Sequence, residues 1–297
     1  MTSSSTPRCR ICGSTEYDLV SRQVAQAPEA TIYRCRNCQI VYVFPIMTEE
    51  EETTFYRDEF EKYMLKRSGA GWKSPETHFR SYQAEGERRL SLVRPYLHAD
   101  DALLEVGSST GYFLDDLRGY VRSVTGVEPS EAYRTFANER GIETLATLDD
   151  WGARTFDVIA LYYVLEHLRD PIGYLASIHG RLKANGRLLI EVPNVEEVLL
   201  TRYHIPSFGP FYWQKAHYHN FSPRTLTDVL ARAGFQTQLI PTQRYDLSNH
   251  MVWMMEGKPG GMGRFANLFT PELETAYSEA LKKQWLCDTV FAVAMVK

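Results

Sequence analysis

Four cysteines in two close pairs place the strongest constraint on the first part of this chain. Cys9 and Cys12 form one C-x-x-C pair, and Cys35 and Cys38 form a second pair after a gap of 22 residues. Each pair can hold one metal ion from a tight turn, and the gap has room for a β-ribbon. Four thiolates at about 2.3 Å in a tetrahedron are typical of structural zinc. The sequence therefore predicts a zinc-binding module over residues 1–46, in which Zn2+ has no open position for catalysis.

Disulfides and redox chemistry are the alternative uses of such cysteines. Residues 1–7 are polar and lack the apolar core of a secretory signal. Thiols stay reduced in the cytosol, and a thioredoxin-like site needs one C-x-x-C rather than two facing pairs. Both points favour zinc and a cytoplasmic location. The fifth cysteine, Cys287, lies in a late apolar segment and is expected to be a buried strand residue.

Length, charge and hydropathy narrow the classes of protein further. The 297 residues suffice for one large α/β domain with a small appendage. A net charge of −4 and a pI of about 6.1 disfavour nucleic acid as a partner, since phosphates are bound by basic surfaces. No apolar run approaches the ~18–20 residues that cross a bilayer, so no membrane partner is expected.

Residues 47–98 are predicted to form a helical linker. Thr48 followed by four glutamates is typical of a capped helix start, because carboxylates are favourable near the positive end of the helix dipole. The apolar spacing predicts an amphipathic helix over 55–72, which Ser68-Gly69-Ala70-Gly71 interrupts. A long helix is predicted over 76–97.

From residue 101 onward, apolar runs of strand length alternate with helical segments. The predicted strands are 102–106, 121–128, 142–145, 156–161 and 187–192, and the predicted helices are 112–119, 130–140 and 171–182. Short connections in this order imply a parallel sheet covered on both faces. We therefore expect a doubly wound α/β core over 99–247 with a substrate-side insertion at 200–222. Residues 248–297 would add a segment able to close the pocket, and a last strand.

The turn after the first of these strands has the composition of a ligand-binding loop. It runs Glu105-Val106-Gly107-Ser108-Ser109-Thr110-Gly111. Ligands of open α/β sheets bind at the carboxyl ends of the strands, and glycine lets the backbone approach them closely. The G-x-G-x-x-G dinucleotide pattern is absent. Glu128 ends the next strand, where a carboxylate can accept hydrogen bonds from both hydroxyls of a ribose. These two features alone still fit a nicotinamide enzyme.

Three later segments distinguish these possibilities by resemblance. The stretch 157–171, which contains Leu165-Glu166-His167-Leu168-Arg169-Asp170-Pro171, resembles the corresponding part of class I S-adenosylmethionine-dependent methyltransferases, as do 182–190 and 222–235. The resemblance covers 101–240. With the cysteine module, the chain is similar to a branch that includes sugar C-methyltransferases and enzymes of polysaccharide and natural-product clusters. It implies a seven-stranded Rossmann-like sheet whose last strand, 289–296, inserts antiparallel.

The resemblance also implies a cofactor, S-adenosyl-L-methionine, and a set of residues that bind it. These residues are Glu105, Gly107, Ser108, Ser109 and Gly111 around the methionine part, Glu128 at the ribose, Pro129 and Ser130 along the adenosine, Leu148 and Asp149 near the adenine, and Tyr162 at the methyl end. Ser109 stands where the family usually has glycine. We expect the serine to adopt φ below zero, with altered loop geometry and cofactor binding retained.

The candidate catalytic residues are histidines. The sulfonium methyl is already activated, so the protein must chiefly align the reacting atoms at about 3–3.5 Å. A base is needed only where the acceptor holds its proton tightly. His167 follows the fourth strand, and His217 and His219 lie in the insertion; for each, structural packing is the alternative role. His217 ranks first because it matches a histidine that often precedes Phe-Ser in these families. A second metal site at His217 and His219 is not expected, since no carboxylate or cysteine is near them.

Aromatic residues flank the loop that carries His217 and His219. They are Tyr203, Phe208, Phe211, Tyr212 and Trp213. Glycine and proline among them argue against a regular helix, and both a substrate-facing wall and a hydrophobic lid fit the pattern.

Three functions follow from these features. The first is methyl transfer to a carbon or oxygen of a small molecule, such as a nucleotide sugar or natural-product intermediate. The second is an RNA methyltransferase whose zinc module docks nucleic acid. The third is a protein that uses S-adenosylmethionine for other chemistry. The sequence leaves the acceptor atom and the oligomeric state open.

Overall fold

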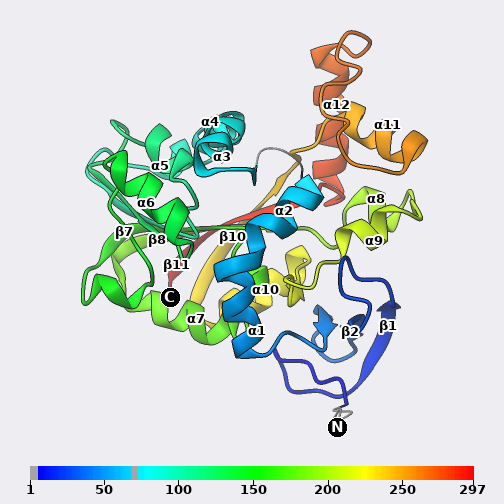
Figure 1. The fold of residues 1–297 in the computed structure, drawn as a ribbon, viewed down its shortest axis with the longest axis horizontal. Coiled ribbons are helices and arrows are strands. Elements are labelled where there is room, and N and C mark those ends of the chain that lie inside the picture. Colours follow the sequence, from blue (N-terminus) through cyan, green and yellow to red (C-terminus); the bar gives the residue numbers. More distant parts are fainter. Residues whose placement is uncertain (1–5, 69–71) are drawn as a thin grey trace. The chain divides into compact units, whose positions relative to one another are not determined.

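A computed structural model describes residues 6–68 and 72–297 (Figure 1). Two compact units share the chain: Met1–Ile46, Leu165–Leu175 and Glu191–Ala292 form the first, and Met47–Val164, Ala176–Ile190 and Val293–Lys297 form the second. The elements belong to two sheets. One has the order β1 (Tyr17–Ser21), β2 (Thr31–Cys35), β3 (Val41–Phe44) and β9 (His219–Asn220). The other has the order β10 (Phe235–Thr242), β11 (Thr289–Val296), β8 (Leu182–Pro193), β7 (Phe156–Tyr162), β4 (Ala102–Val106), β5 (Ser123–Val127) and β6 (Thr144–Leu145).

The ribbon expected between the cysteine pairs is present in the first unit. β1 and β2 pair antiparallel with Tyr17 opposite Cys35, and β3 continues the sheet. The fourth strand, β9, comes from the distant 200–222 insertion and pairs with β3, with Val41 opposite Asn220. The cysteine module therefore completes its sheet with a segment nearly 180 residues further along the chain, which the sequence pattern did not indicate.

The helices of the linker belong to the second unit. α1 (Glu49–Thr54) begins with the expected cap: the Glu51 amide donates to Thr48 Oγ1, and the Glu51 carboxylate accepts from the Thr48 amide. A π-helical turn (Phe55–Glu59) joins α1 to α2 (Phe60–Ser68). Residues 69–71 of the predicted break lie outside the described residues.

The single helix predicted over 76–97 is wrong in one respect. Tyr82, with φ −103° and ψ 7°, separates α3 (Pro75–Ser81) from α4 (Gln83–Val93), and a 3-10 turn (Arg94–Tyr96) follows. The tyrosine ring stacks on His78 with the two ring centroids 4.3 Å apart. This stacking accompanies the break between α3 and α4, and the apolar spacing of the sequence did not indicate it.

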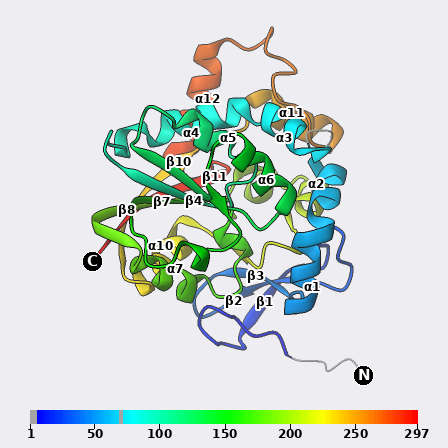
Figure 2. The same cartoon turned by 60° about the vertical axis from the view of Figure 1, so that its left-hand side comes forward.

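The alternation of strands and helices is confirmed in the seven-stranded sheet. β4 pairs in parallel with both β5 and β7, so that Leu103 faces Val124 on one side and Val158 on the other. Helices α5 (Tyr112–Asp116) and α6 (Glu131–Glu139) lie beside this part of the sheet (Figure 2). Strands that are buried on both faces have continuous apolar sequences, and such runs predicted the strands of this sheet.

Several predicted boundaries shift. α5 ends at Asp116 rather than residue 119, and α7 (Pro171–His179) ends before β8 begins at Leu182. Asn185, just beyond the predicted end of that helix, lies inside β8 with φ +65°. Asparagine tolerates this left-handed conformation, so the strand continues through it. Cys287 is buried as expected but lies just before β11 rather than in it.

The C-terminal part of the chain supplies β11, which lies between β10 and β8 as expected for the last strand. The remaining helices are α8 (Val198–Thr201), α9 (Phe208–Tyr212), α10 (Pro223–Arg232), α11 (Leu247–Glu256) and α12 (Pro271–Lys283). The aromatic stretch does form a short helix, α9, contrary to expectation. Phe208 and Phe211 each pack on Trp253 at a centroid distance of 4.9 Å. Within the described ranges, no helix combines the length and the apolar character needed to cross a bilayer.

Candidate cofactor and metal sites

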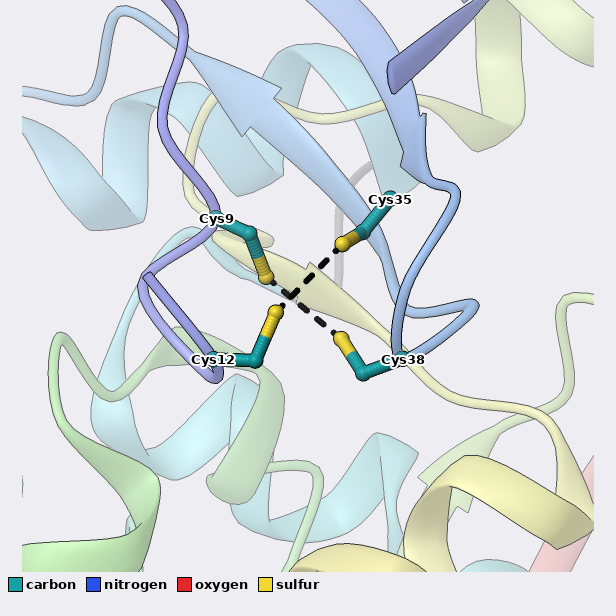
Figure 3. A group of neighbouring side chains, drawn as sticks. All are labelled: Cys9, Cys12, Cys35 and Cys38. Atoms are coloured by element: carbon teal, nitrogen blue, oxygen red, sulfur yellow. Dashed lines mark hydrogen bonds between the residues drawn. The ribbon is translucent and has the colours of Figure 1, made fainter. Parts of the chain in front are cut away.

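The four N-terminal cysteines point toward a common centre (Figure 3). The sulfurs of Cys9 and Cys38 are 3.5 Å apart, as are those of Cys12 and Cys35, and all four lie within 4.8 Å of one another. A tetrahedron with metal–sulfur bonds of about 2.3 Å places its sulfurs at about 3.8 Å. The donor set and its spacing therefore fit a structural Zn2+.

Matched backbone turns hold the two cysteine pairs. The Gly13 amide donates to the Cys9 carbonyl at 2.8 Å, and the Gln39 amide donates to the Cys35 carbonyl at 2.9 Å. Both closing residues have positive φ, +76° for Gly13 and +64° for Gln39. Each turn thus brings the two thiols of its pair to the same side.

The turn after β4 requires glycine at two positions. Gly107 and Gly111 have φ of +72° and +74°. A Cβ on Gly107 would lie 2.6 Å from Val164 Cγ2, and one on Gly111 would lie 2.8 Å from Ile142 Cδ1. The amides of Gly107 and Ser108 both donate to the Val127 carbonyl, which ties the turn to the end of β5. Both conformation and space exclude a larger residue.

Ser109 does not adopt the negative φ that we expected. Its φ is +52°, so the serine keeps the left-handed conformation that glycine usually supplies. Such a conformation costs a non-glycine residue about 1–3 kcal/mol, which surrounding contacts must offset. The Ser109 amide donates to Glu128 Oε2 at 2.8 Å, and its hydroxyl lies 3.4 Å from His78 Nε2. The expected negative φ is therefore wrong, and these contacts hold the positive φ of Ser109.

Glu128 is oriented by two backbone amides. Oε2 accepts from Ser109 and Oε1 accepts from Ser130 at 2.7 Å. Burial raises the pKa of Glu128 to about 7, against the opposing effect of the two amides. Each carboxylate oxygen has a second lone pair with which to accept a hydroxyl. Ser130 also donates its hydroxyl to Glu61 Oε1 at 2.8 Å, while the neighbouring Pro129 is exposed.

Buried polar atoms beside the turn fit a polar ligand. Ser108 Oγ and Glu105 Oε2 are buried, and neither has a hydrogen-bond partner among the residues that the structure describes. Burial raises the pKa of Glu105 to about 8, and Arg89 Nη1 lies 3.6 Å from Glu105 Oε1. Native proteins rarely leave such atoms unsatisfied. Amine, carboxylate and hydroxyl groups like those of S-adenosylmethionine would satisfy them.

The remaining predicted cofactor residues differ in their surroundings. Tyr162 is buried at the end of β7, and the Arg89 guanidinium lies 4.5 Å from the centre of its ring. Leu148 is buried and offers an apolar surface. The Asp149 side chain is 97% exposed and forms a surface ion pair with Arg181, so its carboxylate points into solvent.

Sequence reasoning missed two residues that contact this region. His78 Nδ1 lies 3.0 Å from Thr110 Oγ1 in the turn, and Arg89 lies between Glu105 and Tyr162. Both come from the linker helices, whose apolar spacing signalled only packing. Their burial, 1% exposed for His78 and 5% for Arg89, is unusual for polar side chains and could not be read from the sequence.

The structure groups two of the three candidate histidines. The rings of His167 and His217 meet edge to face with centroids 4.8 Å apart, and ligand atoms of both lie within 4.8 Å of the Glu166 carboxylate. The expectation that no carboxylate lies near His217 is therefore wrong, because Glu166 arrives from a distant part of the sequence. His219 is buried in β9 and does not belong to this group.

Burial determines the charge states of His167, His219 and Glu166. It lowers the pKa of His167 to about 4 and that of His219 to about 4, so both imidazoles are neutral at physiological pH. It raises the pKa of Glu166 to about 8, with a further contribution from the charge of Glu191. His217 Nε2 lies 3.1 Å from the side-chain amide nitrogen of Gln214, which can donate to it.

Removing one thiolate should remove the metal. We expect Cys35→Ser to reduce zinc from one ion per chain to near zero and to lower thermal stability markedly, because binding of a structural zinc contributes about 10–16 kcal/mol in small domains. Metal analysis by mass spectrometry and a melting curve measure both effects. Cys287→Ser is the matched control and should keep its zinc. Equal zinc in wild type and Cys35→Ser would contradict the site.

Gly107→Ala should disrupt the turn while leaving the sheet folded. The added methyl would meet Val164 and the residue would need φ +72°. We expect at least about a tenfold loss of affinity for S-adenosylhomocysteine, measured by calorimetry. Gly152→Ala is a control at φ +56° with nothing within 4 Å of its Cβ, so it carries backbone strain without a clash. Unchanged binding in Gly107→Ala would refute the close approach.

Comparison with known proteins finds relatives that match part of this chain. Curated relatives include a tRNA U34 carboxymethyltransferase from Dichelobacter nodosus, 34% identical over 98 residues that cover 30% of this chain and 31% of that protein. A ubiquinone biosynthesis O-methyltransferase from Actinobacillus pleuropneumoniae is 26% identical over 153 residues, covering 46% of this chain and 65% of that protein. The chain thus spans less than two thirds of the length of either relative.

The fold and the family are shown by two further matches. A crystal structure of a SAM-dependent methyltransferase from Archaeoglobus fulgidus superposes with a TM-score of 0.53 at 18% identity, over 81% of this chain and 100% of that one. The family model described as "Methyltransferase domain" matches residues 77–239. That range is more than half of the chain and contains the glycine turn, Glu128 and Tyr162. The chain belongs to this family of methyltransferase domains.

Proposed function

We propose that this protein is an S-adenosylmethionine-dependent methyltransferase that acts on a carbon or oxygen atom of a small molecule, such as a nucleotide sugar or a natural-product intermediate. The observation that carries the proposal is the Glu128 carboxylate, oriented by the amides of Ser109 and Ser130 beside a turn that only glycine can make at two positions. A carboxylate held in this way suits the two hydroxyls of a ribose.

Each residue of the cofactor site has a role in this proposal. Glu128 accepts from the ribose, Gly107 lets the backbone approach, and buried Ser108 and Glu105 meet polar groups of the methionine part. Leu148, Pro129 and Ser130 line the adenosine, and Asp149 would bind only after leaving Arg181. Bound S-adenosylmethionine supplies a methyl group already activated by its sulfonium, so the protein chiefly has to position the acceptor.

His167 and His217 are the proposed acceptor-side residues, with His219 the third candidate. A neutral imidazole can take a proton from a hydroxyl or an acidic carbon. A pKa of about 4 makes His167 a weak base by itself, so its pairing with His217 and Glu166 is part of the proposal. Residues 200–222 are the proposed substrate-side insertion, and residues 248–284 are the proposed segment that closes the pocket.

Glu128→Ala tests the cofactor site directly. We expect wild type, loaded with zinc, to bind S-adenosylhomocysteine and the variant to bind at least about 100-fold more weakly, because two charge-assisted hydrogen bonds are lost. Calorimetry measures the affinity, and a melting curve confirms folding. Glu143→Ala removes a carboxylate that pairs with Arg154 at the surface, and it should cost much less. A folded wild type that does not bind S-adenosylhomocysteine would end the proposal.

Cofactor affinity should also depend on pH through Glu128. Ribose hydroxyls donate hydrogen bonds and therefore favour the ionised carboxylate. Because the pKa of Glu128 is raised to about 7, we expect affinity to be full at about pH 8 and to fall by roughly tenfold per pH unit well below pH 7. Calorimetry at several pH values measures this change. Glu128→Gln, which cannot ionise, should lack this step, and an identical pH profile in that variant would assign the effect elsewhere.

RNA methylation is the second candidate, supported by the similarity to a protein named tRNA U34 carboxymethyltransferase. That name also keeps open the use of S-adenosylmethionine for another reaction. The pI of about 6.1 disfavours tight binding to phosphates. Incubation with methyl-labelled S-adenosylmethionine and either total tRNA or a small-molecule panel separates these functions. Label in tRNA that is lost at higher salt would support the RNA function.

A reducing compartment completes the proposed function. The four cysteines can act as zinc ligands only while they remain thiolates, which the cytoplasm maintains. We therefore propose a cytoplasmic location and a structural role for the metal, separate from methyl transfer.

A further inference from the structure

Helix α3 places a buried histidine directly against the glycine turn. His78 Nδ1 lies 3.0 Å from Thr110 Oγ1, and His78 Nε2 lies 3.4 Å from Ser109 Oγ. The side chains of His78 and Thr110 are buried, with 1% and 0% of their surfaces exposed. One imidazole thus reaches the hydroxyls of two consecutive residues in the loop between β4 and α5.

Aromatic rings fix the imidazole in this position. Tyr82 stacks on it with centroids 4.3 Å apart and planes 13° apart, and Trp72 meets it edge to face at 4.5 Å. Tyr133 packs against it at 5.0 Å. Tyr82 lies between α3 and α4, Trp72 precedes α3, and Tyr133 belongs to α6. Because the ring is packed on several sides it has little freedom to rotate, so its nitrogens hold fixed positions next to the turn.

The imidazole is also held in one charge state. Burial, and then the nearby positive charge of Arg89, lowers the pKa of His78 to about 3. A neutral imidazole has one donor nitrogen and one acceptor nitrogen, while serine and threonine hydroxyls can serve either role. Both contacts can therefore be satisfied together throughout the physiological pH range.

Ser109 connects this histidine to the ribose carboxylate. Its hydroxyl contacts His78, and its amide donates to Glu128 Oε2 at 2.8 Å. The residue has φ +52°, which serine adopts less readily than glycine. Glycine would relieve that strain but would lack the hydroxyl that contacts His78. Serine at this position therefore has a strained backbone but gains a side-chain contact with His78 of α3.

We propose that His78 is a positioning residue for the cofactor, which acts through the hydroxyls of Ser109 and Thr110 to keep the Ser109 amide on Glu128. The proposal rests on the proposed function, because Glu128 is taken as the ribose ligand. It assigns a binding role to the 47–98 segment, which the sequence indicated only as a helical linker.

His78→Phe tests this role, because phenylalanine keeps an aromatic ring for packing and removes both ring nitrogens. We expect S-adenosylhomocysteine to bind about tenfold more weakly, measured by calorimetry on the zinc-loaded full chain. His78→Gln restores polar atoms and should recover part of the loss. Phe79→Leu is the matched control: it alters the next buried residue of α3, which packs on Phe136, and should leave the affinity within about twofold of wild type.

A double-mutant cycle shows whether the histidine acts through the turn. In a Ser109→Gly, Thr110→Val background, His78→Phe should cost much less affinity than in wild type, because the hydroxyls it contacts are gone. A full tenfold loss in both backgrounds, or an unchanged affinity of His78→Phe in wild type, would overturn the role. If wild type itself fails to bind S-adenosylhomocysteine, the proposed function fails and this role with it. Binding by wild type with no effect of His78→Phe refutes the positioning role alone.

Discussion

The proposed cofactor site is built where β4 pairs in parallel with β5. Val106 lies opposite Val127, so the chain leaves both strands at the same edge of the sheet, one into the glycine turn and the other into Glu128. The Val127 carbonyl accepts hydrogen bonds from the amides of Gly107 and Ser108, and these bonds join the end of β5 to the turn after β4. Gly126 makes this approach possible, since a Cβ there would collide with Ser108 and lie 2.8 Å from Thr144 Oγ1.

Strain at Ser109 is balanced by contacts from two directions. The amide is held by Glu128 and the hydroxyl lies against His78, so a conformation that favours glycine is occupied by serine. Local preference alone predicts either a glycine here or a different loop. Contacts from the surrounding structure hold Ser109 in this strained conformation, as is common at ligand-binding sites. The same contacts tie the linker helix α3 to the glycine turn.

The first unit shows a similar dependence on distant segments. The cysteine turns are local, but the sheet that supports them is completed by β9 from the insertion. Glu166 and His167 form one group with His217, about 50 residues later. Burial favours the neutral forms of both His167 and Glu166.

Features that short sequence patterns encode could be predicted from the sequence. The C-x-x-C pairs define the sulfur cluster because two residues of spacing bring thiols to one turn. Buried parallel strands are recognisable as apolar runs, and the turn beginning at Gly107 and the carboxylate of Glu128 stand at strand ends that the fold must align. The partners of His78 in the glycine turn, the grouping of His167 with His217 and the positive φ of Ser109 could be found only in the tertiary structure. Each depends on side chains that are far apart in sequence and meet only after packing, whereas periodicity and spacing report only neighbours along the chain.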